Sequence, residues 1–349
     1  DDTGNYNDTA FSHEASWESI IIGKSNQLLM EGENIVAVHA FNNSLTSSDF
    51  SFDLELASAP FKVSLIEAAD TEGRFLPITS PNLSPPRGYS FQETEKFNNQ
   101  LITVKTISEQ TSYSKSNHAE GVGQRFFSSD SIIPWISEVD VYAANQWASQ
   151  DFLLSGTPFA PRIEESIIQN HSWISYGYNK NNTPSEVDSI IRFHNEAISR
   201  FDYAINRDQF IACVGLNNES STTVPSILAS SYNAIVVGNT NGSHSRGGTP
   251  SAPVNSSENI NHDGPGRLKP DIVANDNSTS SCTPQVSSAV AFLYGLSLNQ
   301  GKPSACYPET MKAIVMAGAQ KNEFPEWSRS HEKPIDSVLG AGKINVFNS

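Results

Sequence analysis

The chain has 349 residues, and its 38 Asp and Glu outnumber its 22 Lys and Arg, which gives a formal net charge of −16. This charge argues against a nucleic-acid-binding protein, because binding to phosphates needs clustered Lys and Arg. A content of 37% hydrophobic and 17% charged residues is typical of a globular protein rather than a disordered one. The sequence contains no apolar run of 18 or more residues, so we expect no membrane span.

Residues 1–60 are predicted to form a small β-rich module. Apolar runs with β-branched residues occupy 27–30 and 34–40, a turn signal lies at 31–34, and 51–56 alternates apolar and polar residues. The segment resembles part of the β-sandwich accessory modules that accompany bacterial extracellular enzymes. It holds too few strands to close a sandwich, so we interpret the module as partial.

Residues 61–97 are predicted to be a linker. Pro occurs at positions 77, 81, 85 and 86, and Gly at 88. Pro fixes φ and cannot donate to a strand ladder, so this composition indicates a connecting segment rather than a folded one.

Residues 98–349 are predicted to form an α/β domain, a parallel sheet with helices on both faces. In this region apolar segments typical of strands alternate with segments of helical periodicity. Strands are predicted at 101–104, 139–142, 210–214 and 234–237 and at the end of 163–173, and a helix is predicted over 187–205. In folds of this class, functional sites form at the carboxyl ends of the strands.

Ser280 is the candidate nucleophile. It precedes a stretch in which apolar residues recur at three- and four-residue steps from 286 to 296, which predicts a helix with one buried face. Free N–H groups and a partial positive charge at a helix N-terminus favour negative charge that develops nearby. The alternative is a cluster of N-capping residues that performs no chemistry.

Three segments resemble motifs of the subtilisin-like serine peptidase (subtilase) family. Residues 277–286 resemble its nucleophile motif, Gly-Thr-Ser-x-Ala-x-Pro, with Ser280 at the nucleophile position. Residues 266–274, Gly-Arg-Leu-Lys-Pro-Asp-Ile-Val-Ala, are similar to the stretch that leads into this motif, and 340–346 resemble the closing Gly-rich segment. The resemblance implies a subtilisin-like fold in which Ser280 attacks peptide bonds of protein or peptide substrates.

The resemblance also implies a base. His118 opens a segment, 118–123, that is similar to the family's His-Gly-Thr-His-Val-Ala-Gly, in which the first His is the base at the start of a helix. A serine hydroxyl needs such a positioned base to become nucleophilic at neutral pH. The alternative is that His118 is a surface residue without a role.

An oxyanion donor and a cleft segment follow from the same resemblance. Residues 210–219 resemble the strand that ends in Ala-Ala-Gly-Asn-x-Gly, which makes Asn217 the first choice and Asn218 the second for the amide that donates to the oxyanion. The alternative for this pair is a plain turn. The segment that ends in Ser172 and Trp173 resembles one whose backbone lines the substrate cleft, and His171 within it is expected to be structural.

The third member of the triad is not evident. Subtilases order their triad Asp, His, Ser along the chain, but no Asp follows the strand at 101–104, which we interpret as the first core strand. Glu109 is the nearest carboxylate, nine residues before His118, and a Glu can orient an imidazole as an Asp does. The alternative for Glu109 is a solvated position in a loop.

Further departures from the family pattern lie inside the two main motifs. In the nucleophile motif Gly, Ala and His are replaced, and in the base motif Thr is replaced and the second His is missing. The replacing residues are Ser278, Cys282 and Gln285 in the first motif and Glu120 in the second. Because Gly marks positions of unusual φ or close approach, Ser278 raises the question of activity more than of fold.

We therefore expect a secreted bacterial serine endopeptidase, with a catalytically impaired subtilase-fold binding or structural module as the alternative. The resemblance implies an extracellular or cell-envelope location, although no signal peptide is visible, and it suggests Ca²⁺, although no loop has an obvious ligand spacing. No other cofactor or metal is identified. Cys213, Cys282 and Cys306 form neither a disulfide framework nor a metal-binding spacing and are expected to be buried thiols.

Overall fold

The structure of the chain is a computed structural model. It describes residues 62–67, 74–75, 94–97, 100–107, 117–127, 131–133, 136, 138–175, 183–222, 224–225, 227–248, 268–331 and 334–349. All of these residues belong to one compact unit, Pro60–Ser349. The predicted accessory module at 1–60 lies outside the described residues.

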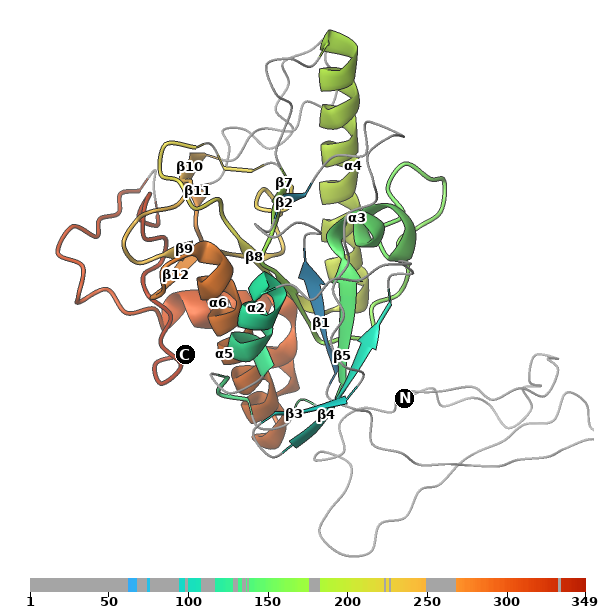
Figure 1. Cartoon of the computed structure of the whole chain (residues 1–349). Coiled ribbons are helices and arrows are strands. Elements are labelled where there is room, and N and C mark those ends of the chain that lie inside the picture. Colours follow the sequence, from blue (N-terminus) through green and yellow to red (C-terminus); the bar gives the residue numbers. More distant parts are fainter. Residues whose placement is uncertain are drawn as a thin grey trace, which may run out of the picture. The chain divides into compact units, whose positions relative to one another are not determined.

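An eight-stranded sheet forms the centre of this unit (Figure 1), and its strands lie in the order β12-β9-β8-β6-β1-β5-β4-β3. Neighbouring strands are parallel except β3 and β4, which pair antiparallel. The strands are β1 (Lys62–Glu67), β3 (Thr94–Phe97), β4 (Gln100–Thr106), β5 (Glu138–Ala143), β6 (Ile168–His171), β8 (Ile211–Gly215), β9 (Ile235–Asn239) and β12 (Ile272–Ala274). Two small sheets pair β2 (Arg74–Phe75) with β7 (Ile174–Ser175) and β10 (Gly247–Gly248) with β11 (Leu268–Lys269).

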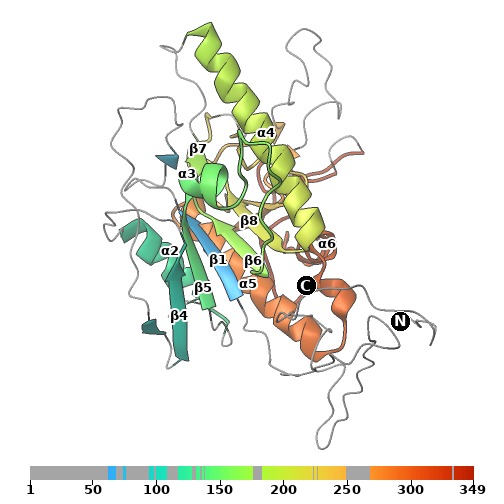
Figure 2. The same ribbon diagram turned by 90° about the vertical axis from the view of Figure 1, so that its right-hand side faces the viewer.

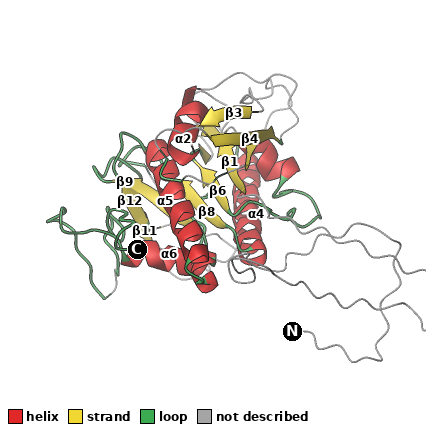
Figure 3. Ribbon diagram, turned by 90° about the horizontal axis from the view of Figure 1, so that it is seen from below, coloured by secondary structure: helices red, strands yellow, loops and turns green. Residues whose placement is uncertain are grey.

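Helices cover both faces of the sheet (Figure 3). On one face lie α2 (Asn117–Phe127), α5 (Thr279–Asn299) and α6 (Pro308–Ala317), and on the other lie α3 (Ala144–Gln146) and α4 (Pro184–Asp208). A π-helical turn at Trp147–Asp151 continues α3, and a 3-10 turn at Pro303–Cys306 precedes α6. Helix α4 starts well beyond the carboxyl ends of the strands and runs back along the sheet (Figure 2). Within the described ranges, no helix is both long and apolar enough to cross a membrane.

The strand residues alternate between two apolar cores, as a period of two requires. In β8, Ile211 and Cys213 pack into the core beneath α2, α5 and α6, whereas Ala212 and Val214 pack into the core beneath α4. All four side chains are buried, which explains why the strand is a continuous apolar run in the sequence. The predicted α/β class, a parallel sheet with helices on both faces, is therefore confirmed.

Each strand and helix predicted in residues 98–349 coincides with an observed element. The predicted strands at 101–104, 139–142, 210–214 and 234–237 overlap β4, β5, β8 and β9, and the end of 163–173 contains β6. The predicted helix at 187–205 lies within α4. This helix begins at a capping box, in which the Thr183 side chain accepts from Glu186 N and the Glu186 side chain accepts from Thr183 N.

The prediction of a linker at 61–97 is wrong for its first residues. Lys62–Glu67 forms β1, which lies between β5 and β6 near the middle of the sheet. Its residues from Val63 to Glu67 are buried, so the α/β unit begins before residue 98. The sequence gives only a weak indication of this strand, because its six residues are followed by a Pro-rich stretch. Its partner strands also lie about 70 or more residues further along the chain, so no local pattern indicates the pairing.

Candidate active site

The sheet has a switch point at β1. The chain places β5, β4 and β3 on one side of β1, and β6, β8, β9 and β12 on the other. A switch point of this kind opens a crevice at the carboxyl ends of the strands, where ligands bind in α/β proteins. Glu67 ends β1 and His171 ends β6, so both residues lie at the carboxyl ends of the two strands where a ligand site is expected.

Glu67 and His118 form a buried pair at this point. His118 is the second residue of α2, and its Nδ1 lies 2.8 Å from Glu67 Oε2. The Glu67 side chain is 0% exposed and that of His118 is 18% exposed. Burial raises the pKa of Glu67, and the charge of His118 and their hydrogen bond act in the opposite direction. When Glu67 is ionised it can only accept, so Nδ1 carries the proton and the basic lone pair of a neutral ring lies on Nε2.

The first turn of α5 presents Ser280. The helix is capped by Ser278, whose side chain accepts from Ser281 N. Ser278 has an extended backbone with φ −149°, which any residue adopts, so its replacement of the family's Gly does not strain this turn. Because Ser278 supplies the cap, Ser280 has no capping role. The alternative interpretation of a capping cluster thus applies to Ser278 and not to the candidate nucleophile.

The Ser280 side chain is half-buried and donates a hydrogen bond of 3.2 Å to the backbone oxygen of Ser172. Ser172 follows β6, so this contact joins the start of α5 to the strand beside β1. A serine hydroxyl has one proton, so in this arrangement the proton points toward Ser172. Donation of this proton to His118 would first require the hydroxyl to turn away from Ser172 by rotation about the Cβ–Oγ bond.

The two candidate oxyanion residues are held differently. Asn217 exchanges backbone hydrogen bonds with the loop after β9, where its N donates to Ser245 Oγ at 3.3 Å and its O accepts from Ser245 N at 2.9 Å. Asn218 reaches α5 with its side chain: its Oδ1 accepts from Thr279 N at 2.8 Å, and Thr279 Oγ1 lies 2.8 Å from the same oxygen. Thr279 is the residue before Ser280, so this geometry favours Asn218, the second choice from the sequence, over Asn217.

His171 and Trp173 belong to a buried polar chain. Trp173 Nε1 donates to His171 Nδ1 at 3.2 Å, and His171 Nε2 lies 3.0 Å from Gln169 Oε1. Burial lowers the pKa of His171 to about 3, so the ring is neutral and donates from Nε2. The chain continues from Gln169 to Glu164, whose pKa burial raises to about 7. His171 has the buried, hydrogen-bonded environment expected of a structural residue.

The three cysteines lie in apolar surroundings. The side chains of Cys213, Cys282 and Cys306 are buried, as the sequence predicts. Burial raises the pKa of Cys213 and of Cys282 to about 12, so neither thiol is a nucleophile near neutral pH. Among the described residues, no three His, Cys, Asp or Glu side chains gather as a metal ion would require, so that part of the chain offers no such cluster for the Ca²⁺ that the resemblance suggests.

Glu67 is the site residue that the sequence reasoning missed. The tentative choice, Glu109, lies outside the described residues, whereas Glu67 contacts the His118 ring. The sequence does carry a signal for this residue, because Val63, Leu65 and Ile66 form an apolar strand pattern that ends in the Glu67 carboxylate. The interpretation of 101–104 as the first core strand hides this signal, because that strand is β4 and β1 precedes it in the same sheet.

Comparisons with known proteins give only distant similarities. No protein-family model matches the sequence, and no curated protein matches it. Among solved structures, the chain is similar to the prenylagaramide maturation protease PagA, with 15% identity over 82% of this chain and 91% of that one and a TM-score of 0.41. It is also similar to a lanthipeptide protease, with 12% identity over 82% and 86% of the two chains and a TM-score of 0.45. Fervidolysin from Fervidobacterium pennivorans, a keratinolytic enzyme related to subtilisin, is 13% identical over 82% of this chain and 42% of that one, with a TM-score of 0.42.

Proposed function

We propose that this chain is a divergent subtilisin-like serine endopeptidase with the triad Glu67, His118 and Ser280. The observation that supports this most strongly is the 2.8 Å contact between His118 Nδ1 and the buried Glu67 carboxylate. A buried carboxylate is costly unless it is paired, and its pairing with the family's base position is the arrangement that orients a catalytic imidazole. The chain order of carboxylate, His and Ser is also the subtilase order.

In the proposed reaction, Ser280 Oγ attacks the carbonyl carbon of a peptide bond while His118 Nε2 takes the hydroxyl proton. Glu67 stabilises the imidazolium that results. His118 then gives this proton to the leaving amine, the C–N bond breaks, and an acyl-enzyme remains on Ser280. Water, deprotonated by His118 in the same way, hydrolyses the ester and restores the serine.

The proposed oxyanion site lies at the start of α5. With Asn218 Oδ1 accepting from Thr279, the amide NH₂ of Asn218 is the remaining donor of this side chain and lies next to the residue before Ser280. Backbone N–H groups of the first helical turn supply further donors and the positive end of the helix dipole. Ser172 and Trp173 are proposed to line the cleft with their backbone, as the sequence resemblance implies.

The test is hydrolysis of casein by the full chain and by a Ser280→Ala variant. The proposal predicts turnover by the wild type and none by the variant. The variant should keep its fold, because the loss of one half-exposed hydrogen bond costs only about 1 kcal/mol. Turnover that survives the substitution would remove Ser280 from the mechanism.

A second candidate function, a non-catalytic binding module with the same fold, is favoured by one observation. The Ser280 proton points to the backbone oxygen of Ser172 instead of to His118. If this arrangement persists with a peptide bound, the hydroxyl is not activated. The absence of casein turnover together with saturable binding of casein would support this second function, and turnover that depends on Ser280 would exclude it.

A further inference from the structure

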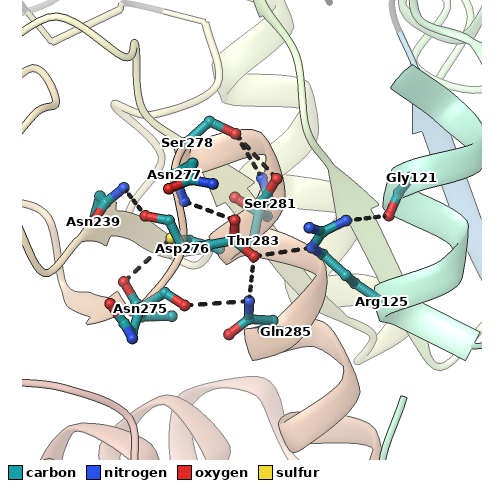
Figure 4. Close-up of polar contacts among 12 residues, drawn as sticks. Gly121, Arg125, Asn239, Asn275, Asp276, Asn277, Ser278, Ser281, Thr283 and Gln285 are labelled. Atoms are coloured by element: carbon teal, nitrogen blue, oxygen red, sulfur yellow. Dashed lines mark hydrogen bonds and ion pairs between the residues drawn. The ribbon is translucent and has the colours of Figure 1, made fainter. Parts of the chain in front are cut away.

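A cluster of polar contacts around Asp276 joins helix α2 to helix α5 (Figure 4). Arg125 of α2 donates from Nε to Asp276 Oδ2 at 2.9 Å, and Gln285 of α5 donates from Nε2 to the same oxygen at 2.8 Å. Asp276 Oδ1 accepts from Asn277 N at 2.7 Å. One carboxylate therefore receives donors from α2, from α5 and from the segment between β12 and α5.

The Arg125 guanidinium is fixed by a second bond. Its Nη1 donates to the backbone oxygen of Gly121, one turn earlier in α2, at 3.0 Å. A Cβ at Gly121 would lie 3.7 Å from this nitrogen, so a larger side chain there would extend toward the space that the guanidinium occupies. The Arg125 side chain is 28% exposed and that of Asp276 is 13% exposed, so the pair is only partly screened by solvent.

The cluster is close in sequence to both proposed reacting residues. Arg125 follows His118 by seven residues, which is two helical turns and places both on one side of α2. Asp276 precedes Ser280 by four residues, and the Asn239 side chain also holds the Asp276 backbone oxygen. A shift of Asp276 relative to Arg125 would therefore be a shift of Ser280 relative to His118.

Apolar packing also joins the two helices, but it fixes their register less sharply than hydrogen bonds do. The α2 side chains Val122 and Phe126 pack with Val286 and Val290 of α5, but apolar contacts are not directional. Hydrogen bonds between charged groups have defined distances and angles. They can therefore hold the two helices in one register where the apolar surfaces would allow small displacements.

Two departures from the family motifs meet in this cluster. Gly121 stands where the base motif has its second His, and Gln285 stands where the nucleophile motif has its His. In the structure both contact the same pair, Gly121 through Arg125 and Gln285 through Asp276. The two replacements, which look unrelated along the chain, thus belong to one set of contacts.

We propose that Arg125, Asp276 and Gln285 are positioning residues that set the distance between the His118 helix and the Ser280 helix. The proposal rests on the proposed function for its catalytic consequence. It assigns none of the three to proton transfer or to substrate contact. Their effect is on the alignment of Ser280 with His118, where an error of about 1 Å costs about a hundredfold in rate.

The experiment compares Arg125→Met, Asp276→Asn, the double variant and Arg125→Lys in the full chain. Fluorophosphonate labelling of Ser280 and casein kcat should fall between about tenfold and a hundredfold in the first three, with KM unchanged. The double variant should lose no more than the worse single variant, because both remove one contact. Arg125→Lys keeps the charge but cannot bond Asp276 and Gly121 in the same geometry, so its rate should lie in between.

The matched control is Arg200→Met on α4, on the other face of the sheet. Arg200 binds Glu196 at 2.7 Å and the backbone oxygens of Thr157 and Leu153, so its loss should lower Tm and leave kcat unchanged. The proposal would be overturned if Arg125→Met and Asp276→Asn kept the wild-type rates. It would also be overturned if Arg200→Met lost as much kcat as these two variants at a matched loss of Tm.

A spectroscopic readout keeps this test separate from the proposed function. The ¹⁵N NMR signals of the His118 ring should shift in Arg125→Met and Asp276→Asn and should stay in place in Arg200→Met. If Ser280 of the wild type never reacts with the fluorophosphonate, the proposed peptidase function is refuted. The ¹⁵N signals of His118 then still test the positioning role. Unshifted His118 signals in both cluster variants would refute the positioning role.

Discussion

Replacing Glu67 by Gln tests the part of the site that the sequence did not reveal. The amide keeps the size of the side chain and removes the charge that faces His118 Nδ1 at 2.8 Å. If the amide NH₂ donates to Nδ1, the neutral ring carries its proton on Nε2 and can no longer accept from Ser280. If instead the amide oxygen accepts, the imidazolium that forms during the reaction still loses its counter-charge.

The size of the effect follows from this geometry. Two unit charges about 4 Å apart interact by about 4 kcal/mol at an effective dielectric constant of about 20, which corresponds to about a thousandfold in rate. The wrong tautomer adds to this, and exchanging the orienting carboxylate of a serine peptidase for an amide lowers kcat by about 10⁴. We therefore expect Glu67→Gln to lower casein kcat by about 10³ to 10⁴ with KM changed by less than about threefold.

Stability separates this effect from misfolding. Burial raises the pKa of Glu67 above its ordinary value of 4.5, so ionisation of Glu67 costs folding free energy as the pH rises past that value. Gln is neutral throughout, and the variant should gain stability relative to the wild type between pH 4 and pH 8 in urea unfolding. Glu164→Gln is the matched control, a buried carboxylate away from His118, and it should leave kcat unchanged. A Glu67→Gln variant with wild-type kcat would refute the assignment of the triad.

Three further predictions follow from the same geometry. Asn218→Asp keeps an acceptor for Thr279 but removes the NH₂ donor, so kcat should fall by about 10²–10³. Asn217→Asp should change kcat by less than about tenfold. Equal effects of the two substitutions would contradict the preference for Asn218. Exchanging Glu109 for Gln should leave casein kcat unchanged, and a loss comparable to that of the Glu67 variant would return Glu109 to the mechanism. Burial lowers the pKa of His171 to about 3, so the neutral ring contributes stability above its unfolded pKa of about 6.5, and this contribution is lost as the pH falls. Between pH 7 and pH 5 the free energy of unfolding in urea should therefore fall by about 2 kcal/mol more in the wild type than in His171→Gln.

The sequence supplies candidates for those parts of the site whose signals are local. Ser280 is a candidate nucleophile because its motif and the apolar periodicity of α5 lie within about 20 residues. The α/β class followed from the apolar runs of β8 and β9, which are buried on both faces.

Contacts between distant segments were beyond the sequence. Glu67 and His118 are 51 residues apart, and Arg125 and Asp276 are 151 residues apart. The packing of α2 on the face of the sheet that carries β1 brings the first pair together, and the packing of α2 on α5 brings the second. Neither pairing follows from local propensity, because parallel strands and packed helices are selected by the whole fold.

The order of the two Asn residues shows the same limit. The motif resemblance ranks Asn217 before Asn218, but the two residues are adjacent and identical in type, so the pattern does not indicate where either side chain points. The structure separates them, because the Asn218 side chain bonds to Thr279 of α5, whereas Asn217 bonds to Ser245 through its backbone.

The most direct test of the proposed triad is to identify the residue that a fluorophosphonate labels in the full chain. Peptide mass spectrometry would locate the adduct in the wild type and compare its rate of formation with that in Glu67→Gln. We expect a single adduct on Ser280, formed at least about a hundredfold more slowly in the variant. An adduct on another residue, or no adduct under conditions in which a known subtilase is fully labelled, would contradict the proposed triad.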